Sequence, residues 1–152
     1  MTIFGKRNKN EALHANIIRL QELQRNLRKL REIYGEVRNY KIANNLKKIC
    51  IINDKIFKEI SLNQNKISGS ATYIDYYIPT LIKILEQYSN IKENKLKDTL
   101  NESTVANIEK AVDDIEVAFN KILNGLYKGD NNDVYVEIKV LLSELKNIED
   151  KT

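Results

Sequence analysis

Apolar residues that recur every three or four positions are the feature that most constrains this chain. The pattern is most regular between residues 105 and 126. There the recurring residues are Val105, Ile108, Val112, Ile115, Phe119, Ile122 and Leu126. This spacing places side chains on one face of an α-helix, and that face is stable only when other helices cover it. The sequence therefore predicts amphipathic helices that pack against one another.

The first helix is predicted from Glu11 to Val37. Its apolar residues fill the a and d positions of a heptad repeat, and these are Leu20, Leu23, Leu27, Leu30, Tyr34 and Val37, with Leu13 and Ile17 extending the stripe toward the start. A heptad of this kind is typical of a coiled coil, and it could serve a homodimer through the first helix or an intramolecular bundle. Residues 1–9 carry little apolar surface and are expected to be flexible.

The remaining segments complete an all-α prediction. A turn is expected at residues 38–40, a second helix from 42 to 60, a loop at 61–70, a third helix reaching about Ile91, and a last helix over residues 134–148. Asn53 interrupts the apolar seam of the second helix, either as a buried amide or, as we expect, at the seam edge. The predicted fold is an elongated bundle of about five mostly antiparallel helices, in one domain spanning residues 1–152.

Composition agrees with this fold and limits the compartment. The chain is 42% apolar and 30% charged, with one proline and five glycines. The only cysteine, Cys50, cannot form an internal disulfide, and it is expected to be a small buried residue. No window approaches the roughly 20 apolar residues needed to span a bilayer, and the N-terminus lacks the apolar core of a signal peptide. We therefore expect a cytoplasmic protein.

Charge is distributed unevenly along the chain. Residues 1–48 contain twelve Lys or Arg against four Glu, a net of +8, whereas the remainder has a net of −4. One interpretation is that a basic first helix lies beside acidic later helices. The other is a basic surface for an anionic membrane or a nucleic acid. Arg25, Arg28 and Lys29 are the candidate residues, because the heptad places them away from the apolar seam.

The stretch from Ser70 to Asn90 is unusual because it holds four of the eight tyrosines and the only proline, Pro79. Pro79 could begin the third helix, or it could kink a helix that begins earlier; the unbroken apolar rhythm from Ile74 to Leu81 favours the kink. Tyr77 and Tyr88 are expected to point inward. Tyr73, Tyr76 and Pro79 are the candidate partner surface, with the two tyrosines toward an adjacent face; the alternative is that all four tyrosines pack in the core and at its boundary.

No arrangement of residues points to catalysis. The single histidine, His14, is expected to be solvated, and the chain has no phosphate-binding GxxxxGK[ST] loop. A helical two-metal site would need Glu-x-x-His pairs, and no histidine lies in the later helices. The sequence gives no catalytic residue, and no metal or cofactor is expected.

The tyrosine-proline stretch resembles the XpaC-like family of 5-bromo-4-chloroindolyl phosphate hydrolysis proteins. The resemblance rests on Tyr76, Tyr77, Ile78, Pro79 and Thr80, followed by Leu81, Ile84, Leu85 and Tyr88. The pattern of Ile108, Ala111, Ile115, Ala118, Phe119, Leu123 and Leu126 is similar to the family's following helix. The resemblance covers about residues 13–145, and some family members carry hydrophobic N-terminal segments.

The resemblance implies two functions of different classes. The family name implies a phosphate-ester hydrolase acting on an indolyl phosphate. The family's setting implies membrane stress or toxic-anion resistance. Because the residues offer no catalytic constellation, our leading hypothesis is a non-enzymatic helical domain that binds a partner protein.

Overall fold

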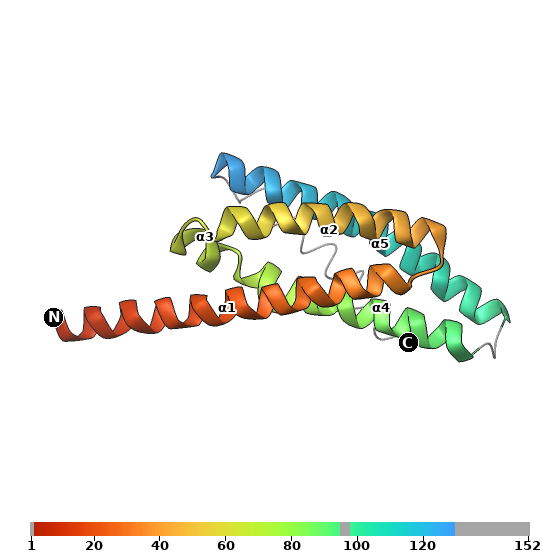
Figure 1. Ribbon diagram of the computed structural model, residues 1–152, viewed down its shortest axis with the longest axis horizontal. Helices are drawn as coiled ribbons and strands as arrows, with labels where there is room; N and C mark the ends of the chain where they lie inside the picture. Colours follow the sequence, from red (N-terminus) through yellow and green to blue (C-terminus); the bar gives the residue numbers. More distant parts are fainter. Residues whose placement is uncertain (1, 95–97, 130–152) are drawn as a thin grey trace.

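The computed structural model describes residues 2–94 and 98–129, with side chains described for 9–89 and 103–129. Each element is helical, which confirms the all-α class. In chain order the elements are α1 (Thr2–Glu36), α2 (Tyr40–Ile60), α3 (Gln64–Gly69), the π-helical turn η1 (Tyr73–Tyr77), α4 (Ile78–Asn94) and α5 (Asp98–Lys128). The four long helices alternate in direction along an elongated bundle (Figure 1).

Helix packing follows the predicted apolar faces. The helix α2 lies between α1 and α5, with its most extensive contact to α5, and α4 packs on α1 and on α5. The shared core takes its residues from each long helix, such as Leu23, Ile49, Leu81 and Ile115. Burying each aliphatic side chain stabilises the bundle by about 1.5–3 kcal/mol before the entropy of ordering is counted. The long helices are therefore held by tertiary packing.

The helix boundaries differ from the predicted ones in several places. Helix α1 begins at Thr2 rather than near Glu11, and the predicted loop at 61–70 contains the short helix α3. Asn63 caps α3 by accepting from the Lys66 N–H at 2.8 Å. The predicted turn at 38–40 is confirmed, because Asn39 caps α2 in the same way. The last helix predicted at residues 134–148 lies outside the described residues.

The apolar seam of α1 is covered over only part of its length. Leu23, Leu27 and Leu30 are buried, but the first turns of α1 project beyond the other helices in Figure 1. Leu13 and Ile17, predicted to extend the seam, are consequently exposed. Buried Asn16 joins α1 to α3, where it donates to Gln64 Oε1 at 2.8 Å.

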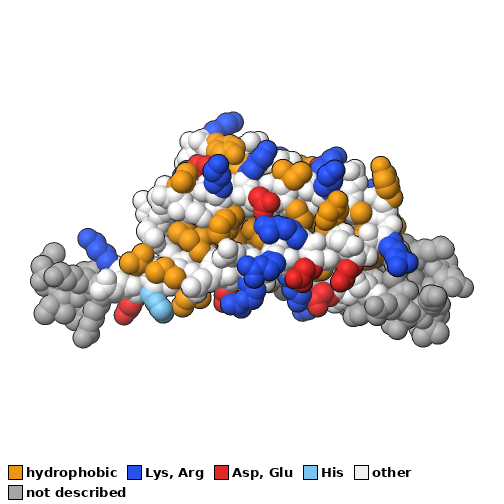
Figure 2. Space-filling view, in the orientation of Figure 1, with side chains coloured by type: hydrophobic (Ala, Val, Ile, Leu, Met, Phe, Trp, Pro, Cys, Tyr) orange, Lys and Arg blue, Asp and Glu red, His pale blue; other side chains and the backbone are white. Residues whose placement is uncertain are grey.

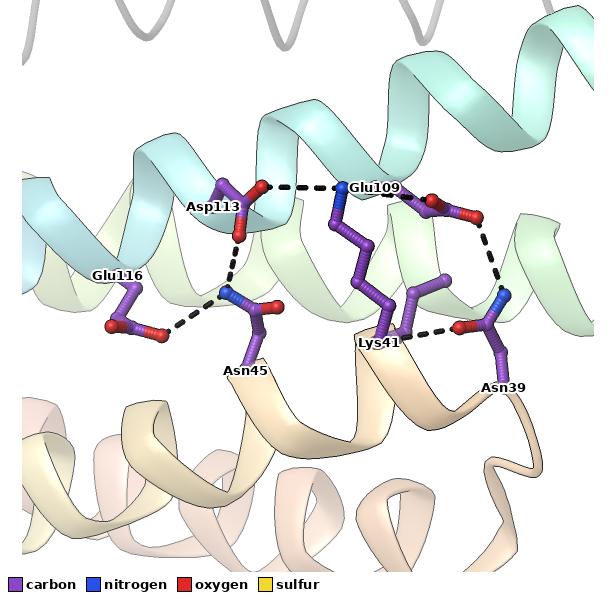
Figure 3. Close-up of polar contacts among 7 residues, drawn as sticks. Asn39, Lys41, Asn45, Glu109, Asp113 and Glu116 are labelled. Carbon is purple, nitrogen blue, oxygen red and sulfur yellow. Dashed lines mark hydrogen bonds and ion pairs between the residues drawn. The ribbon is translucent and has the colours of Figure 1, made fainter.

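A polar cluster that the sequence did not predict joins α2 to α5 (Figure 3). Asn45 Nδ2 donates to Asp113 Oδ1 at 2.6 Å and to Glu116 Oε1 at 3.0 Å. One turn earlier, Lys41 Nζ lies 3.7 Å from Asp113 Oδ2 and 3.8 Å from Glu109 Oε2. Acidic side chains of α5 are thereby paired with Lys41 and Asn45 of α2.

Candidate interaction surface at the π-turn

The helical backbone runs continuously from Ala71 into α4, and it widens into the π-turn η1 just before Pro79. In a regular helix the carbonyl of Asp75 would need an N–H from residue 79, which proline lacks, and the proline ring would strike that carbonyl. Instead the N–H of Ile78 bonds to the carbonyl of Tyr73, five residues back. The extra residue in this turn makes room for the proline. Pro79 therefore lies in a continuous helix, as the apolar rhythm favoured.

The structure corrects the expected position of Tyr73. Instead of lying on an outer face, its side chain is only 3% exposed. Its hydroxyl donates to Asn53 Oδ1 at 2.6 Å, and its ring meets Phe119 edge-on at 5.3 Å. Asn53 is itself buried rather than at the seam edge. Tyr73 and Tyr77, like Ile74 and Ile78, are four residues apart, so both pairs lie on the inner face of the helix.

Tyr76 remains on the outside of the same turn. It is 37% exposed, and its ring contacts the buried ring of Tyr77 edge-on at 6.1 Å. The neighbouring Asp75 Oδ2 accepts from Arg19 Nε of α1 at 3.2 Å. Pro79 is half-buried one turn later. We call Arg19, Asp75, Tyr76 and Pro79 the Tyr76 surface.

The predicted basic residues of α1 are exposed, and they differ in their pairing. Lys29 Nζ lies 3.1 Å from Glu86 Oε1 of α4, and Arg31, which was not in the predicted set, pairs with Asp54 of α2 at 2.7 Å. The first interpretation of the charge asymmetry thus holds for these cations. Within the described residues, Arg25 and Arg28 have no ion-pair partner.

The pKa values of Cys50 and Tyr73 are both raised. Burial, followed by the negative charge of Asp54, raises the pKa of the Cys50 thiol, although Arg31 opposes the shift. Burial and the Asp54 charge also raise the pKa of the Tyr73 phenol well above 10.0. Neither side chain is therefore an activated nucleophile near neutral pH. His14 is exposed on α1.

Neither a cluster of metal-ligating side chains nor a membrane-spanning helix occurs among the described residues. Over that part of the chain, no three or more His, Cys, Asp or Glu side chains gather closely enough to hold a metal ion. Nor does any helix there combine the length and apolarity required to cross a bilayer.

Comparison with known families identifies the family of this chain. Residues 8–141 match the model of the 5-bromo-4-chloroindolyl phosphate hydrolysis protein family, a range that takes in every helix from α2 to α5. The chain belongs to this family. Comparison with curated proteins and with solved structures gave no match. The sequence resemblance to the family rested mainly on Tyr76 to Thr80. In this family member these residues form the end of the π-turn and the start of α4.

One surface of this family member was missed from its sequence. The solvent face of α2 carries several lysines together with exposed apolar residues such as Ile51. The signal was present, because these residues occupy the positions that the apolar seam of residues 42–60 leaves outward.

Proposed function

We propose that this protein is a non-enzymatic helical domain that binds a partner protein through the Tyr76 surface. The observation that carries the proposal is an exposed tyrosine on a rigid base. Tyr76 stands on the ring of Tyr77, between the buried Tyr73 and the proline. The backbone beneath it is anchored by the hydrogen bond from Tyr73 to Asn53.

A tyrosine held in this way suits a protein interface. Its ring offers apolar area and its hydroxyl a polar contact, and few rotamers are lost when a partner covers it. Arg19 and Asp75 supply both signs of charge beside the ring, as at the polar rim of an interface. Tyrosine and arginine are also the residue types that most often dominate binding energy.

The matched test compares two exposed tyrosines. Tyr76→Ala is expected to reduce capture of a partner from cell lysate by at least roughly 10-fold, corresponding to about 1.4 kcal/mol. Tyr127→Ala, on α5, removes a ring that is also exposed, and it should leave capture unchanged. Cells under membrane stress or toxic-anion exposure, the setting implied by the family, are the source of the lysate.

The controls separate a lost surface from a lost fold. Helical circular dichroism and the unfolding midpoint should be the same for both variants and the parent protein. If Tyr76→Ala and Tyr127→Ala retain equal capture, the assignment of the partner surface is wrong.

The alternative function is hydrolysis of an indolyl phosphate, which the family description names. Phosphoryl transfer requires groups that stabilise the negative charge of the transition state, together with a nucleophile or an activated water. We expect no turnover of 5-bromo-4-chloroindolyl phosphate above background by the purified protein with Mg²⁺, Mn²⁺ or Zn²⁺. Turnover that is proportional to protein and is abolished by changing one acidic residue would replace the proposal.

A further inference from the structure

The solvent face of α2 carries a line of apolar side chains. Tyr40 at its start, Ile51 in its middle and Leu62 just beyond its end are 85%, 48% and 68% exposed. Tyr40 and Ile51 are eleven residues apart, which is close to three whole helical turns, so they lie nearly in one row, and Leu62 follows eleven residues later in the turn after α2. The row is roughly 33 Å long at about 1.5 Å per residue.

Lysines flank this row on both sides. Lys47 and Lys58 lie on one edge and Lys48 and Lys55 on the other, by their positions around the helix. In the described part of the chain, none of the four has an ion-pair partner. Figure 2 shows the result over α2, where lysine and hydrophobic atoms are interspersed. We call the row and its lysines the α2 stripe.

The two acids of α2 do not neutralise the stripe. Asp54 pairs with Arg31 of α1, and Glu59 pairs with Lys66 of α3. The helices α1 and α2 are antiparallel, so Arg28 on α1 and Lys58 on α2 each lie one turn from the Arg31–Asp54 pair in the same direction. Arg28 therefore extends the positive surface onto α1.

We propose that the α2 stripe is a docking surface for an anionic lipid bilayer, with α2 lying in the plane of the membrane. Apolar side chains in a row can enter the boundary between headgroups and acyl chains, while lysines on both edges reach lipid phosphates. A helix in the interface needs its apolar row and its cations on the same exposed side, and the α2 stripe meets this requirement.

The apolar row also distinguishes a bilayer from a nucleic acid. Exposed Ile51 at the centre of the surface and Leu62 at its end would face phosphates or water on a nucleic-acid backbone and gain nothing there. The four flanking cations are all lysines, whereas arginine leads in base recognition. The contribution of the apolar row to binding affinity therefore distinguishes a bilayer from a nucleic acid.

Vesicle binding by the full chain tests the proposal. The probes are vesicles of phosphatidylcholine alone and of phosphatidylcholine mixed with phosphatidylglycerol, and we expect binding to the mixture only. Lys47→Gln with Lys55→Gln should weaken that binding by roughly 30-fold, and Ile51→Ser by about 10-fold. Lys110→Gln with Lys128→Gln removes the same charge from exposed positions on α5, and it should change binding by less than about 3-fold.

Three outcomes would overturn the proposal. The first is no binding to the anionic vesicles. The second is an equal loss of vesicle binding in the α2 and α5 lysine variants. The third is vesicle binding that Ile51→Ser does not weaken, together with tighter binding of a labelled RNA or DNA duplex. The proposal stands apart from the partner surface, because Tyr76→Ala should leave vesicle binding unchanged. Failure at one surface is therefore distinguishable from failure at the other.

Discussion

Among single residues, Tyr73 connects the most elements of this bundle. Its hydroxyl bonds to Asn53 of α2 and its ring packs on Phe119 of α5, while its backbone carbonyl closes the π-turn. The Nδ2 atom of Asn53 has no hydrogen-bond acceptor among the described residues. Removing this buried hydrogen bond should therefore change the free energy of unfolding measurably.

The first prediction concerns this pair. Tyr73→Phe removes the donor and leaves Asn53 Oδ1 buried without a partner, so it should lower the free energy of unfolding by about 1–3 kcal/mol. Adding Asn53→Leu replaces the remaining polar group with an apolar one of similar size and should recover most of this loss. Urea denaturation of the single and double variants measures both effects. A double variant less stable than Tyr73→Phe alone would contradict the expectation.

The second prediction is the pH dependence of the same residue. The pKa of Tyr73 is raised in the folded protein, so the folded state holds the phenolic proton more tightly than the unfolded state does. The stabilising contribution of the hydroxyl is then complete below the unfolded pKa of about 10 and declines as pH rises above it. The difference in stability between the parent protein and Tyr73→Phe should therefore narrow at alkaline pH. A constant difference from pH 7 to above 10 would exclude this linkage.

At the scale of elements, two glycines at helix ends should respond oppositely to the same change. Gly35 lies in the last turn of α1 with open space around it, so Gly35→Ala should add about 0.5–1 kcal/mol to the free energy of unfolding. Gly129 also has open space, but it ends α5 with a φ of 74°, so Gly129→Ala should cost about 1 kcal/mol. Thermal unfolding of the two variants checks the signs; equal shifts would contradict them.

The π-turn and Pro79 are expected to be energetically coupled. Deleting Tyr76 removes the additional residue and would force a regular helix onto the proline, at a cost of about 3 kcal/mol. With Pro79→Ala in the same chain, the restored N–H can bond four residues back, and much of the loss should be recovered. Chemical denaturation of the four forms measures this coupling. Purely additive costs would mean that the proline does not cause the wide turn.

The sequence predicted the long helices well because their apolar residues keep a strict rhythm, as from Val105 to Leu126. It missed α3 because Asn63 and its neighbours read as a turn, although Asn63 is also a capping residue. It misplaced Tyr73 because the predicted seam began at Ile74, although Tyr73 lies four residues before Tyr77 and therefore shares its inner face. It could not give the pairing of Asn45 with Asp113, because residues that far apart in the chain meet only through tertiary packing.

At the scale of the whole molecule, paired and unpaired cations lie on different parts of the surface. Cations of α1 pair with η1, α2 and α4, and Lys41 pairs with α5, so the unpaired lysines of α2 remain on one side. Such exposed ion pairs each contribute about 0–1 kcal/mol, so they orient helices more than they stabilise them. The buried apolar residues between the helices stabilise the bundle instead, and those of α1 pack against helices of the same chain.

The final prediction compares two leucines of one heptad repeat. Leu23 is 0% exposed, and Leu23→Ala should cost about 2–5 kcal/mol because it leaves a cavity between α1 and its neighbours. Leu13 is 44% exposed, and Leu13→Ala should cost less than about 1 kcal/mol, with an unfolding midpoint independent of protein concentration. A homodimer through the first helix would bury Leu13 in a second chain. In that case Leu13→Ala would be nearly as costly as Leu23→Ala, and the midpoint of the parent protein would rise with concentration. Denaturation at several concentrations, alongside sedimentation, distinguishes an intramolecular bundle from a dimer.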